Sequence, residues 1–554
     1  MVTQQKPEEI AAKGTGLVLL TLASAQFLMT LDSSVMNVSI ATVAKDVGTT
    51  VTGIQTAITL YTLVMATLML TGGKIGAIIG RRRAFSIGCV IYAAGSLTTA
   101  LAPNLGVLIL GWSFLEGIGA ALIMPAVVAL VAVNFAPQRR PSTYGTIAAA
   151  GAIAVALGPL IGGAFTTYAS WRYVFVGEVV IALVILVLSR RIQDAPSTEQ
   201  HRLDFVGSIL SVLGLGLAVF GVLRSSVWGW IIPKQDAPSI FGLSLVAWLI
   251  LAGILILWGL FSWERRLEKE GKEPLVRPSM FRNRQLDSGL TMFLFQYFIQ
   301  AGIFFTIPLF LSIVLELSAL QTGIRLIPLS LALLVSAIGV PRLWPKASPR
   351  RVVRIGLLLL LAATVLLIAL LDADATASVV TVPLLIIGLG IGALASQLGA
   401  VTVSAVPDKE SSEVGGLQNT ALNLGASLGT ALVGSVLITI LTTLFLQGVL
   451  ANPSIPDSLK ADAQTTFGAG APFVSDTTAR MSLEAYGASE ATIQEVLQIN
   501  ADARLAALRG ALFVVAIVAA IALFFTRQIP TVQPGASTVV PEDAGVKDLQ
   551  EQAE

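Results

Sequence analysis

The sequence has little charge. Only 12% of its 554 residues are Asp, Glu, Lys or Arg, whereas 55% are hydrophobic. An ordinary soluble domain carries roughly 25% charged residues. A chain of this length with so few charges cannot cover a globular surface with groups that water solvates well, which excludes a soluble enzyme, a disordered chain and a coiled coil. What remains is a protein that crosses a membrane many times.

Cysteine and histidine are nearly absent, with one residue of each, Cys89 and His201. They cannot form an internal disulfide, a thiol-based metal or redox site, or a catalytic triad. No block of Lys and Arg is interleaved with aromatic residues, and no P-loop occurs. We therefore expect no cofactor and no nucleic-acid partner, and a membrane-embedded enzyme or receptor is only a remote alternative.

Apolar runs of spanning length recur along the chain, at about 20 residues per span. About fourteen helices are predicted, at residues 16–38, 52–73, 84–102, 106–132, 143–167, 172–189, 205–223, 240–262, 287–311, 322–341, 352–371, 379–403, 415–447 and 509–527. An even number of spans places both termini on one side. Most Lys and Arg residues fall in segments that place this side in the cytoplasm. The sequence thus predicts an all-α, multi-pass protein of the cell membrane.

Three acidic residues lie inside apolar runs: Asp32, Glu116 and Glu178. At about 1.5 Å per residue, Asp32 and Glu178 lie roughly 9 Å from the outer ends of their spans, and Glu116 lies nearer the middle. No Lys or Arg lies inside the first six spans, so removal from water favours the protonated acids. Each acid can exchange a proton or neutralise a cation. Alternatively, each is a neutral group that only stabilises packing.

Aromatic residues accompany these acids. Trp112 lies four residues before Glu116, which predicts that the two share a helix face. A ring beside a carboxylate suits a lipophilic cation. Phe295 and Tyr297 of the ninth span are further candidates for lining a cavity, although aromatic residues in a span also commonly face lipid or the core.

Two glycine-rich segments are candidates for conformational motifs. The loop after the second span reads GGKIGAIIGRRRAF, and the fifth span contains GPLIGG. The first places a positive cluster at a cytoplasmic helix junction, where it could equally be a topology anchor; the second predicts a bend and close helix packing. The residues concerned are Gly73, Gly80, Arg81, Arg82, Arg83, Gly158, Pro159, Gly162 and Gly163.

Together these residues resemble the fourteen-span drug:proton antiporter branch of the major facilitator superfamily. In LDSSVMNVSIA, Asp32 is followed five residues later by Asn37, as in the branch's first-span signature, which makes Asn37 a further cavity candidate. GKIGAIIGRRR is similar to the superfamily's loop motif, LEGIGAALIMPA to its fourth-span motif and LGPLIGG to the antiporter motif. WRYVF, LDFVG, EPLV and LSALQTGIRLIPLS follow in family order, so the resemblance covers about residues 15–530.

The resemblance implies two six-helix bundles with two inserted helices, working by alternating access around a central cavity, most often as a monomer. It implies proton coupling or cation recognition at Asp32 and an exporter's bend at Gly158 and Pro159. The expected segments are tail 1–15, bundle 16–190, linker 191–204, inserted helices 205–262, charged loop 263–286, bundle 287–528 with outer loop 448–508, and tail 529–554. Within the outer loop, the spacing of apolar residues after 489 predicts a small helical cap.

The sequence also departs from the family's motifs. Ala77 and Ile78 replace the usual Asp and Arg of the loop motif, and Ser113 replaces the usual Arg of the fourth span. Glu116 stands where Gln or an apolar residue is common, and Glu178 where Asn is common. A membrane cation is lost and two acids are gained, which predicts a more negative cavity or a different proton path.

We therefore predict a secondary active transporter, not an enzyme, that exports amphiphilic compounds, cations among them, in exchange for protons. Its energy source would be the proton gradient, and its partners the substrate, protons and the bilayer. An alternative is export of a lipid or an endogenous metabolite, favoured by the altered loop motif and the long outer loop. Proton exchange requires that water reach the acids. If the structure showed the carboxyl groups sealed between helices with neutral partners, the proton-exchange mechanism would fail and only the predicted fold would stand.

Overall fold

The computed structural model describes residues 7–49, 51–194, 203–234, 237–372, 375–407, 410–467, 471 and 473–533. Thirteen helices in this part of the chain are long and apolar enough to cross a membrane. Helix α3 (Arg81–Ala100) is also of spanning length but begins with three arginines and lies outside that set. With α3, the helices follow the order of the predicted spans, and the fold is an all-α, multi-pass membrane architecture.

The first half of the chain forms one group of helices. They are α1 (Pro7–Asp46), α2 (Val51–Ile79), α3, α4 (Leu105–Leu108), the π-helix η1 (Ile109–Glu116), α5 (Gly117–Asn134), η2 (Pro137–Arg139), α6 (Arg140–Tyr168), α7 (Arg172–Leu188) and η3 (Ser189–Arg191). α1 packs along α6, and α3 packs against both α5 and α7. The π-helix interrupts the fourth span, where the sequence predicted a regular α-helix.

Two helices follow this group, α8 (Phe205–Trp228) and α9 (Leu245–Lys269). Between them lies an unpredicted hairpin of two-residue strands, β1 (Ser239–Ile240) and β2 (Leu243–Ser244). α8 packs against both α2 and α14 (Ser411–Ala451), whereas α9 packs mainly on α8. Leu251, Leu255 and Trp258 of α9 are exposed, as expected for a helix that faces lipid.

The second half forms another group. It contains η4 (Pro278–Arg282), α10 (Arg284–Leu309), the π-helix η5 (Phe310–Val314), α11 (Ala319–Leu343), α12 (Pro349–Leu370), η6 (Ala377–Val380), α13 (Thr381–Val403), α14, α15 (Asp457–Phe467), α16 (Asp476–Ala485), α17 (Glu490–Phe525) and η8 (Thr526–Gln528). α10 packs on α14, α11 on α13, and α12 on α13 and α17.

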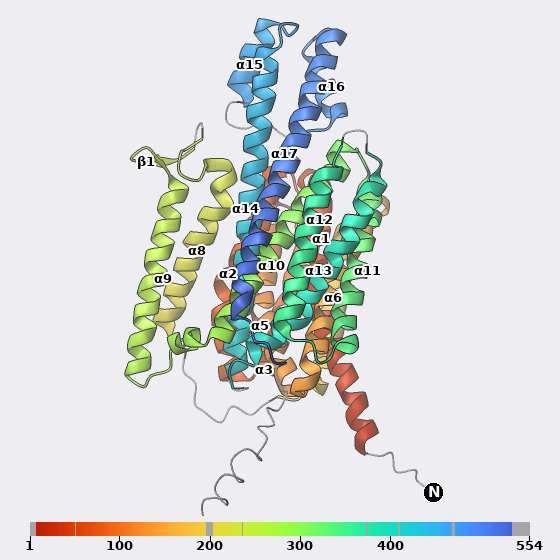
Figure 1. Cartoon of the computed structure of the whole chain (residues 1–554). Helices are drawn as coiled ribbons and strands as arrows, with labels where there is room; N and C mark the ends of the chain where they lie inside the picture. Colours follow the sequence, from red (N-terminus) through yellow and green to blue (C-terminus); the bar gives the residue numbers. More distant parts are fainter. Residues whose placement is uncertain are drawn as a thin grey trace, which may run out of the picture.

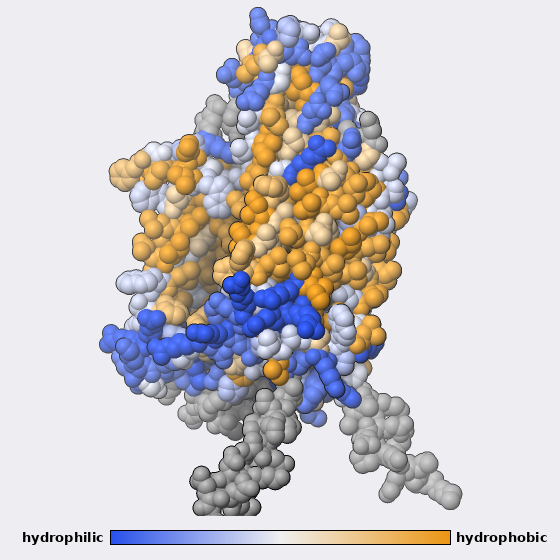
Figure 2. Space-filling view, viewed as in Figure 1, coloured by the Kyte–Doolittle hydropathy of each residue, from blue (hydrophilic) through white to orange (hydrophobic). Residues whose placement is uncertain are grey.

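The molecule has two distinct ends, separated by an apolar belt (Figure 2). We call the end that carries Arg81–Arg83 the basic end; hydrophilic side chains gather there in Figure 2. α15 and α16 lie at the opposite end, at the top of Figure 1, which we call the cap end. Such a belt between two polar ends is typical of a protein embedded in a bilayer.

The cap is more helical than the predicted outer loop. α14 continues to Ala451 and α17 begins at Glu490, so both membrane helices run on into the region 448–508. They continue because apolar residues bury one another there: Val449, Leu459 and Val496 belong to one small core. The predicted helix after residue 489 is present as the first part of α17.

The two groups of helices meet closely near the basic end. A Cβ atom on Gly145 of α6 would overlap the carbonyl oxygen of Ala337 in α11. A Cβ atom on Gly415 of α14 would lie 2.7 Å from the carbonyl oxygen of Pro125 in α5. Because glycine has no side chain, the backbones of the two groups can approach directly.

Candidate functional site: a cluster of three buried carboxyl groups

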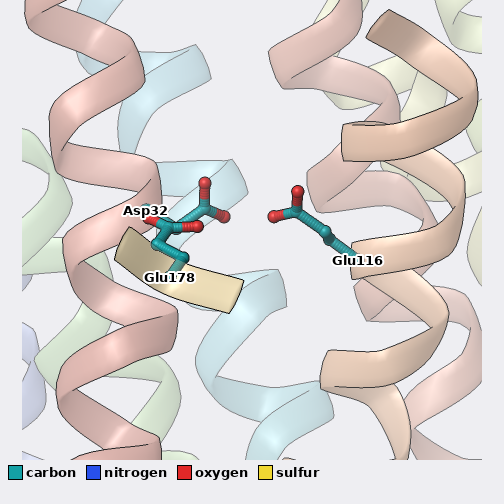
Figure 3. A group of neighbouring side chains, drawn as sticks. All are labelled: Asp32, Glu116 and Glu178. Atoms are coloured by element: carbon teal, nitrogen blue, oxygen red, sulfur yellow. The ribbon is translucent and has the colours of Figure 1, made fainter. Parts of the chain in front are cut away.

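The structure brings together the three acids that the sequence placed in separate spans. Asp32 comes from α1, Glu116 from the last position of η1 and Glu178 from α7, and the exposed fraction of each is at most 1%. One carboxyl oxygen of each residue lies within 4.8 Å of those of the other two. Figure 3 shows the Glu116 carboxyl pointing across the site toward Asp32 and Glu178. We refer to these residues as the acid cluster.

Glycines allow the helices of the cluster to approach one another. A Cβ atom on Gly95 of α3 would lie 2.7 Å from the backbone nitrogen of Glu116 and 2.8 Å from the carbonyl oxygen of Gly111. α3 therefore lies directly against η1, and its next turn presents Thr99 to Glu116. Short π-helical segments are frequent at functional sites, and this one carries both Trp112 and Glu116.

Each carboxyl group has one neutral hydrogen-bonding neighbour. The pairs are Trp112 Nε1 and Asp32 Oδ1 at 2.7 Å, Tyr92 Oη and Glu178 Oε2 at 3.3 Å, and Thr99 Oγ1 and Glu116 Oε1 at 3.1 Å. The second oxygen of each carboxyl group is buried and has no hydrogen-bond partner. Buried polar atoms without a partner are costly, so these three oxygens need an explanation.

Aromatic residues close one side of the cluster. The ring of Tyr61 in α2 stacks on that of Trp112, with centroids 5.1 Å apart and an interplanar angle of 8°. Trp112, Tyr61 and Tyr92 are almost completely buried. The predicted proximity of Trp112 to the acids is therefore present, but the indole contacts Asp32 of another helix.

The electrostatics of the cluster exclude full ionisation. In the part of the chain that the structure describes, the ion pairs involve other acids, and none joins Lys or Arg to the cluster. Two carboxylates 4.8 Å apart repel each other by about 3–4 kcal/mol at an effective dielectric constant of roughly 20. The sealed cluster must therefore hold protons or a cation.

The cluster is closed to solvent in this conformation. The requirement that water reach the acids is therefore not met here, and each acid has a neutral neighbour, as in the alternative that assigns them to packing. The mutual proximity of the acids distinguishes the cluster from that alternative, because a packing role does not need three carboxyl groups to meet. Exchange with water requires the helices to separate.

The other cavity candidates are not brought together. Phe295 of α10 lies against Phe525 of α17, with ring centroids 5.4 Å apart, and so packs within the second half. Tyr297, on the same helix, is partly buried. Asn37 lies in α1, but its side chain is outside the described part of the structure. A cavity shared by these residues with Trp112 stays a prediction.

The loop motif is held by a residue that the sequence analysis missed. Gly80 has a φ of 99°, a conformation that favours glycine, and directly precedes α3. The Asp194 carboxylate accepts hydrogen bonds from the backbone nitrogens of Arg81 and Arg82, at 3.2 and 3.1 Å. An acid at a helix N-terminus is favoured by the helix dipole, so Asp194 fixes this junction. Arg83 is exposed, and Gly73 is buried within α2.

The glycine motif of the fifth span packs directly against α1. A Cβ atom on Gly158 would overlap Ser34 Oγ, and one on Gly162 would lie 3.1–3.2 Å from Val35 atoms. Gly163 is partly buried, and α6 runs without interruption through the motif. The side chain of Pro159 lies outside the described part. This contact fixes α1 two residues from Asp32.

A second group of charged residues lies at the basic end, where a buried pair joins the two halves. Lys74 of α2 is fully buried, and its Nζ lies 3.0 Å from Glu413 Oε1 of α14 and 3.8 Å from Glu273 Oε2. Nearby, Arg277 Nη1 lies 2.6 Å from Glu410 Oε1. We call Lys74, Glu413, Glu273, Arg277 and Glu410 the basic-end ion pairs. The sequence placed Lys74 in the loop after the second span, outside the membrane. That prediction is wrong: Lys74 lies inside α2, where pairing with Glu413 compensates for its burial.

Lys74 belongs to the loop motif in which Ala77 and Ile78 replace the usual Asp and Arg. The ion pair with Glu413 thus supplies a charged contact across the two halves where the motif lacks its own. Ser113, at the position of the missing fourth-span Arg, donates instead to the carbonyl oxygen of Ala57 at 2.8 Å and ties η1 to α2.

Comparison with known proteins agrees with this architecture. The model of the Major Facilitator Superfamily matches residues 22–207 and 201–430. The chain is 30% identical over 424 residues to a puromycin resistance protein of Streptomyces alboniger, covering 76% of this chain and 81% of that one. It is 26% identical over 418 residues to a tetracenomycin C resistance and export protein of Streptomyces glaucescens, covering 75% and 74%.

A solved structure supports the same fold. The human organic anion transporter MFSD10 is similar with a TM-score of 0.55 at 14% identity, and the match covers 94% of this chain and all of that one. At this identity the likeness concerns the fold alone. The family model, the relatives and the helix arrangement agree: the chain belongs to the Major Facilitator Superfamily of membrane transporters.

Proposed function

We propose that the protein exports amphiphilic, drug-like compounds across the cell membrane in exchange for protons. The observation that carries the proposal is the acid cluster, whose three carboxyl groups lie within 4.8 Å of one another without a basic partner among the described residues. The resistance and export functions named for its relatives support the choice of drug-like substrates. In this proposal the basic end faces the cytoplasm, in keeping with the charge distribution.

Exchange follows from competition for one negative site. When the helices open toward the acidic outer side, a proton from water binds Asp32 and neutralises it, which releases a bound cation or amphiphile. When they open toward the cytoplasm, Asp32 loses the proton and can accept the next substrate. The present conformation, with its basic-end ion pairs formed and its cluster sealed, corresponds to a state closed toward the cytoplasm.

The surroundings of Asp32 suit a cationic or aromatic substrate. The Trp112 indole, stacked on Tyr61, lies beside the carboxylate. A cation placed there would be attracted by both the ring face and the carboxylate, and the attraction is stronger in a site that excludes water.

The test is reconstitution in vesicles with an imposed pH gradient and a panel of lipophilic cationic dyes and neutral lipids. Asp32→Asn should abolish gradient-driven dye efflux at unchanged protein level. Asp502→Asn, which alters an exposed carboxylate of the cap end, is the matched control and should transport normally. Normal dye efflux by Asp32→Asn would refute the proposal. Unchanged dye efflux combined with altered lipid transport would favour the lipid exporter.

A further inference from the structure

The Thr99 hydroxyl reports on the protonation of Glu116. Its oxygen lies 2.9 Å from the carbonyl oxygen of Gly95 and 3.1 Å from Glu116 Oε1. A hydroxyl group has one hydrogen, and a backbone carbonyl can only accept. When Thr99 donates to Gly95, four residues back in the same helix, the contact with Glu116 is a hydrogen bond only if Glu116 carries a proton and donates it.

The titratable groups around Glu116 favour the same state, whereas the Ser96 hydroxyl of α3, which does not titrate, also faces this carboxyl group. Asp32 on α1, Tyr61 on α2, Tyr92 on α3 and Glu178 on α7 are the titratable groups that face Glu116 across the cluster. None of them is a cation. An ionised Glu116 would therefore compete with Gly95 for the single Thr99 hydrogen, whereas a protonated Glu116 satisfies both contacts at once.

Asp32 differs from Glu116 in the type of its neighbour. The Trp112 indole nitrogen can only donate, and it lies 2.7 Å from Asp32 Oδ1. A group that can only donate is matched to the charged form of a carboxyl group, because an ionised carboxylate is purely an acceptor. The two acids therefore have neighbours of opposite preference, although they belong to the same cluster.

We propose that Glu116 keeps its proton throughout the transport cycle and that Asp32 carries the exchangeable charge. This assignment rests on the proposed function for its transport part. The Glu116 proton is donated to Thr99, and Glu116 Oε2, which has no partner, accepts the O–H of Asp32 when a proton from the outer side binds there. One proton enters and leaves through Asp32, and Glu116 is a positioning residue that stabilises the loaded state.

Two substitutions at Glu116 separate the possible roles. Glu116→Gln keeps the pattern, because its amide N–H donates to Thr99 and its carbonyl accepts from Asp32; the half-maximal pH of gradient-driven efflux should therefore move far less than in Glu116→Leu. Glu116→Leu removes the acceptor for the loaded Asp32. Half-maximal efflux by Glu116→Leu should therefore require a proton concentration about tenfold higher than in the wild type, which is the size of effect expected for the loss of one buried hydrogen bond.

Infrared spectroscopy measures the protonation state of Glu116 independently of any transport assay. The infrared C=O stretch of protonated carboxyl groups should persist in the purified protein at alkaline pH. The Glu116 component, taken as the difference between the wild type and Glu116→Gln, should be present in it. Loss of the band in the wild type at alkaline pH, loss of gradient-driven efflux in Glu116→Gln, or Ca²⁺ bound to the cluster would each overturn the assignment. If Asp32→Asn transported normally, the proposed function would fail, while the infrared band would still decide the state of Glu116.

Discussion

Two regions of the described chain hold carboxyl groups in different surroundings: in one they are paired with cations, and in the other they face one another. At the basic end, Glu413 lies 3.0 Å from the Lys74 ammonium, and Glu410 lies 2.6 Å from the Arg277 guanidinium. In the acid cluster, three carboxyl groups face one another with only neutral neighbours. A paired charge stabilises one arrangement of helices, whereas an unpaired one requires a proton or a cation and so responds to what the solvent supplies.

The largest expected effect comes from breaking the paired region. Lys74→Met leaves Glu413 buried without a cation, and loss of one partner of a buried pair costs about 3–5 kcal/mol. The thermal midpoint should fall, and hydrogen exchange should rise in the first turns of α14. Lys272→Met, which removes an exposed pair with Glu270, is the control.

The pair can also be exchanged rather than removed. The double variant Lys74→Glu with Glu413→Lys restores opposite charges across the same contact and should recover part of the lost stability. An unchanged thermal midpoint and unchanged exchange in Lys74→Met would show that this pair does not hold the halves together.

Within the acid cluster, the second-largest effect is expected from removing the Trp112 N–H that donates to Asp32. Trp112→Phe keeps an aromatic ring against Tyr61 but removes the N–H, a charge-assisted bond worth about 1.5–3 kcal/mol. The ionised Asp32 is then less stable, so the half-maximal pH of efflux should move toward alkaline values, opposite to Glu116→Leu. Trp248→Phe, which loses a bond to Ile240 at the exposed hairpin, should leave it unchanged.

The cluster can also be disturbed without altering a carboxyl group or its donor. Gly158→Ala would push α1 away at Ser34, near Asp32, at a cost of about 1–3 kcal/mol for overpacking. Efflux by Gly158→Ala should fall because α1 is displaced. Adding Ser34→Gly to this variant should restore efflux by removing the obstructing side chain. Gly259→Ala in α9, where a Cβ atom meets open space, is the control. Full efflux activity of Gly158→Ala would show that the contact between Gly158 and Ser34 does not affect the acid cluster.

The smallest effect concerns a carboxylate outside the membrane. Hydrogen bonds from the Thr477 hydroxyl and backbone N–H lower the pKa of Glu316 below its usual range. A lowered folded-state pKa stabilises the cap above the ordinary Glu pKa of about 4.3, and this stabilisation is lost as the pH falls through the lowered value.

Because Glu316 is exposed, its contribution to the stability of the cap is about 0.5 kcal/mol or less. Glu316→Gln should raise hydrogen exchange in α16 at neutral pH and flatten its dependence on acid. Asp457→Asn, a highly exposed residue of α15, serves as the control. A pH dependence unchanged by Glu316→Gln would assign the cap's acid response to another group.

Much of the architecture could be predicted from local patterns. Runs of apolar residues located the spans, and the motifs around Asp32, Gly80 and Gly158 identified the family. The exceptions are instructive: the π-helix Ile109–Glu116 has no distinct apolar period, and α14 and α17 extend beyond the belt because their apolar residues bury one another in the cap. Both depend on neighbours far away in the chain.

The sequence by itself determined that three acids lie within the membrane without nearby cations, because hydropathy and charge are local properties of each span. Only the tertiary structure decided that these acids meet, that Thr99 of α3 contacts Glu116 of η1, and that Lys74 reaches Glu413, 339 residues away. The physical reason is that the apolar residues of a helix place it in the bilayer but do not determine which other helices pack against it. Close contacts at residues such as Gly95 and Gly111 select which faces meet, and these contacts form only when the helices pack.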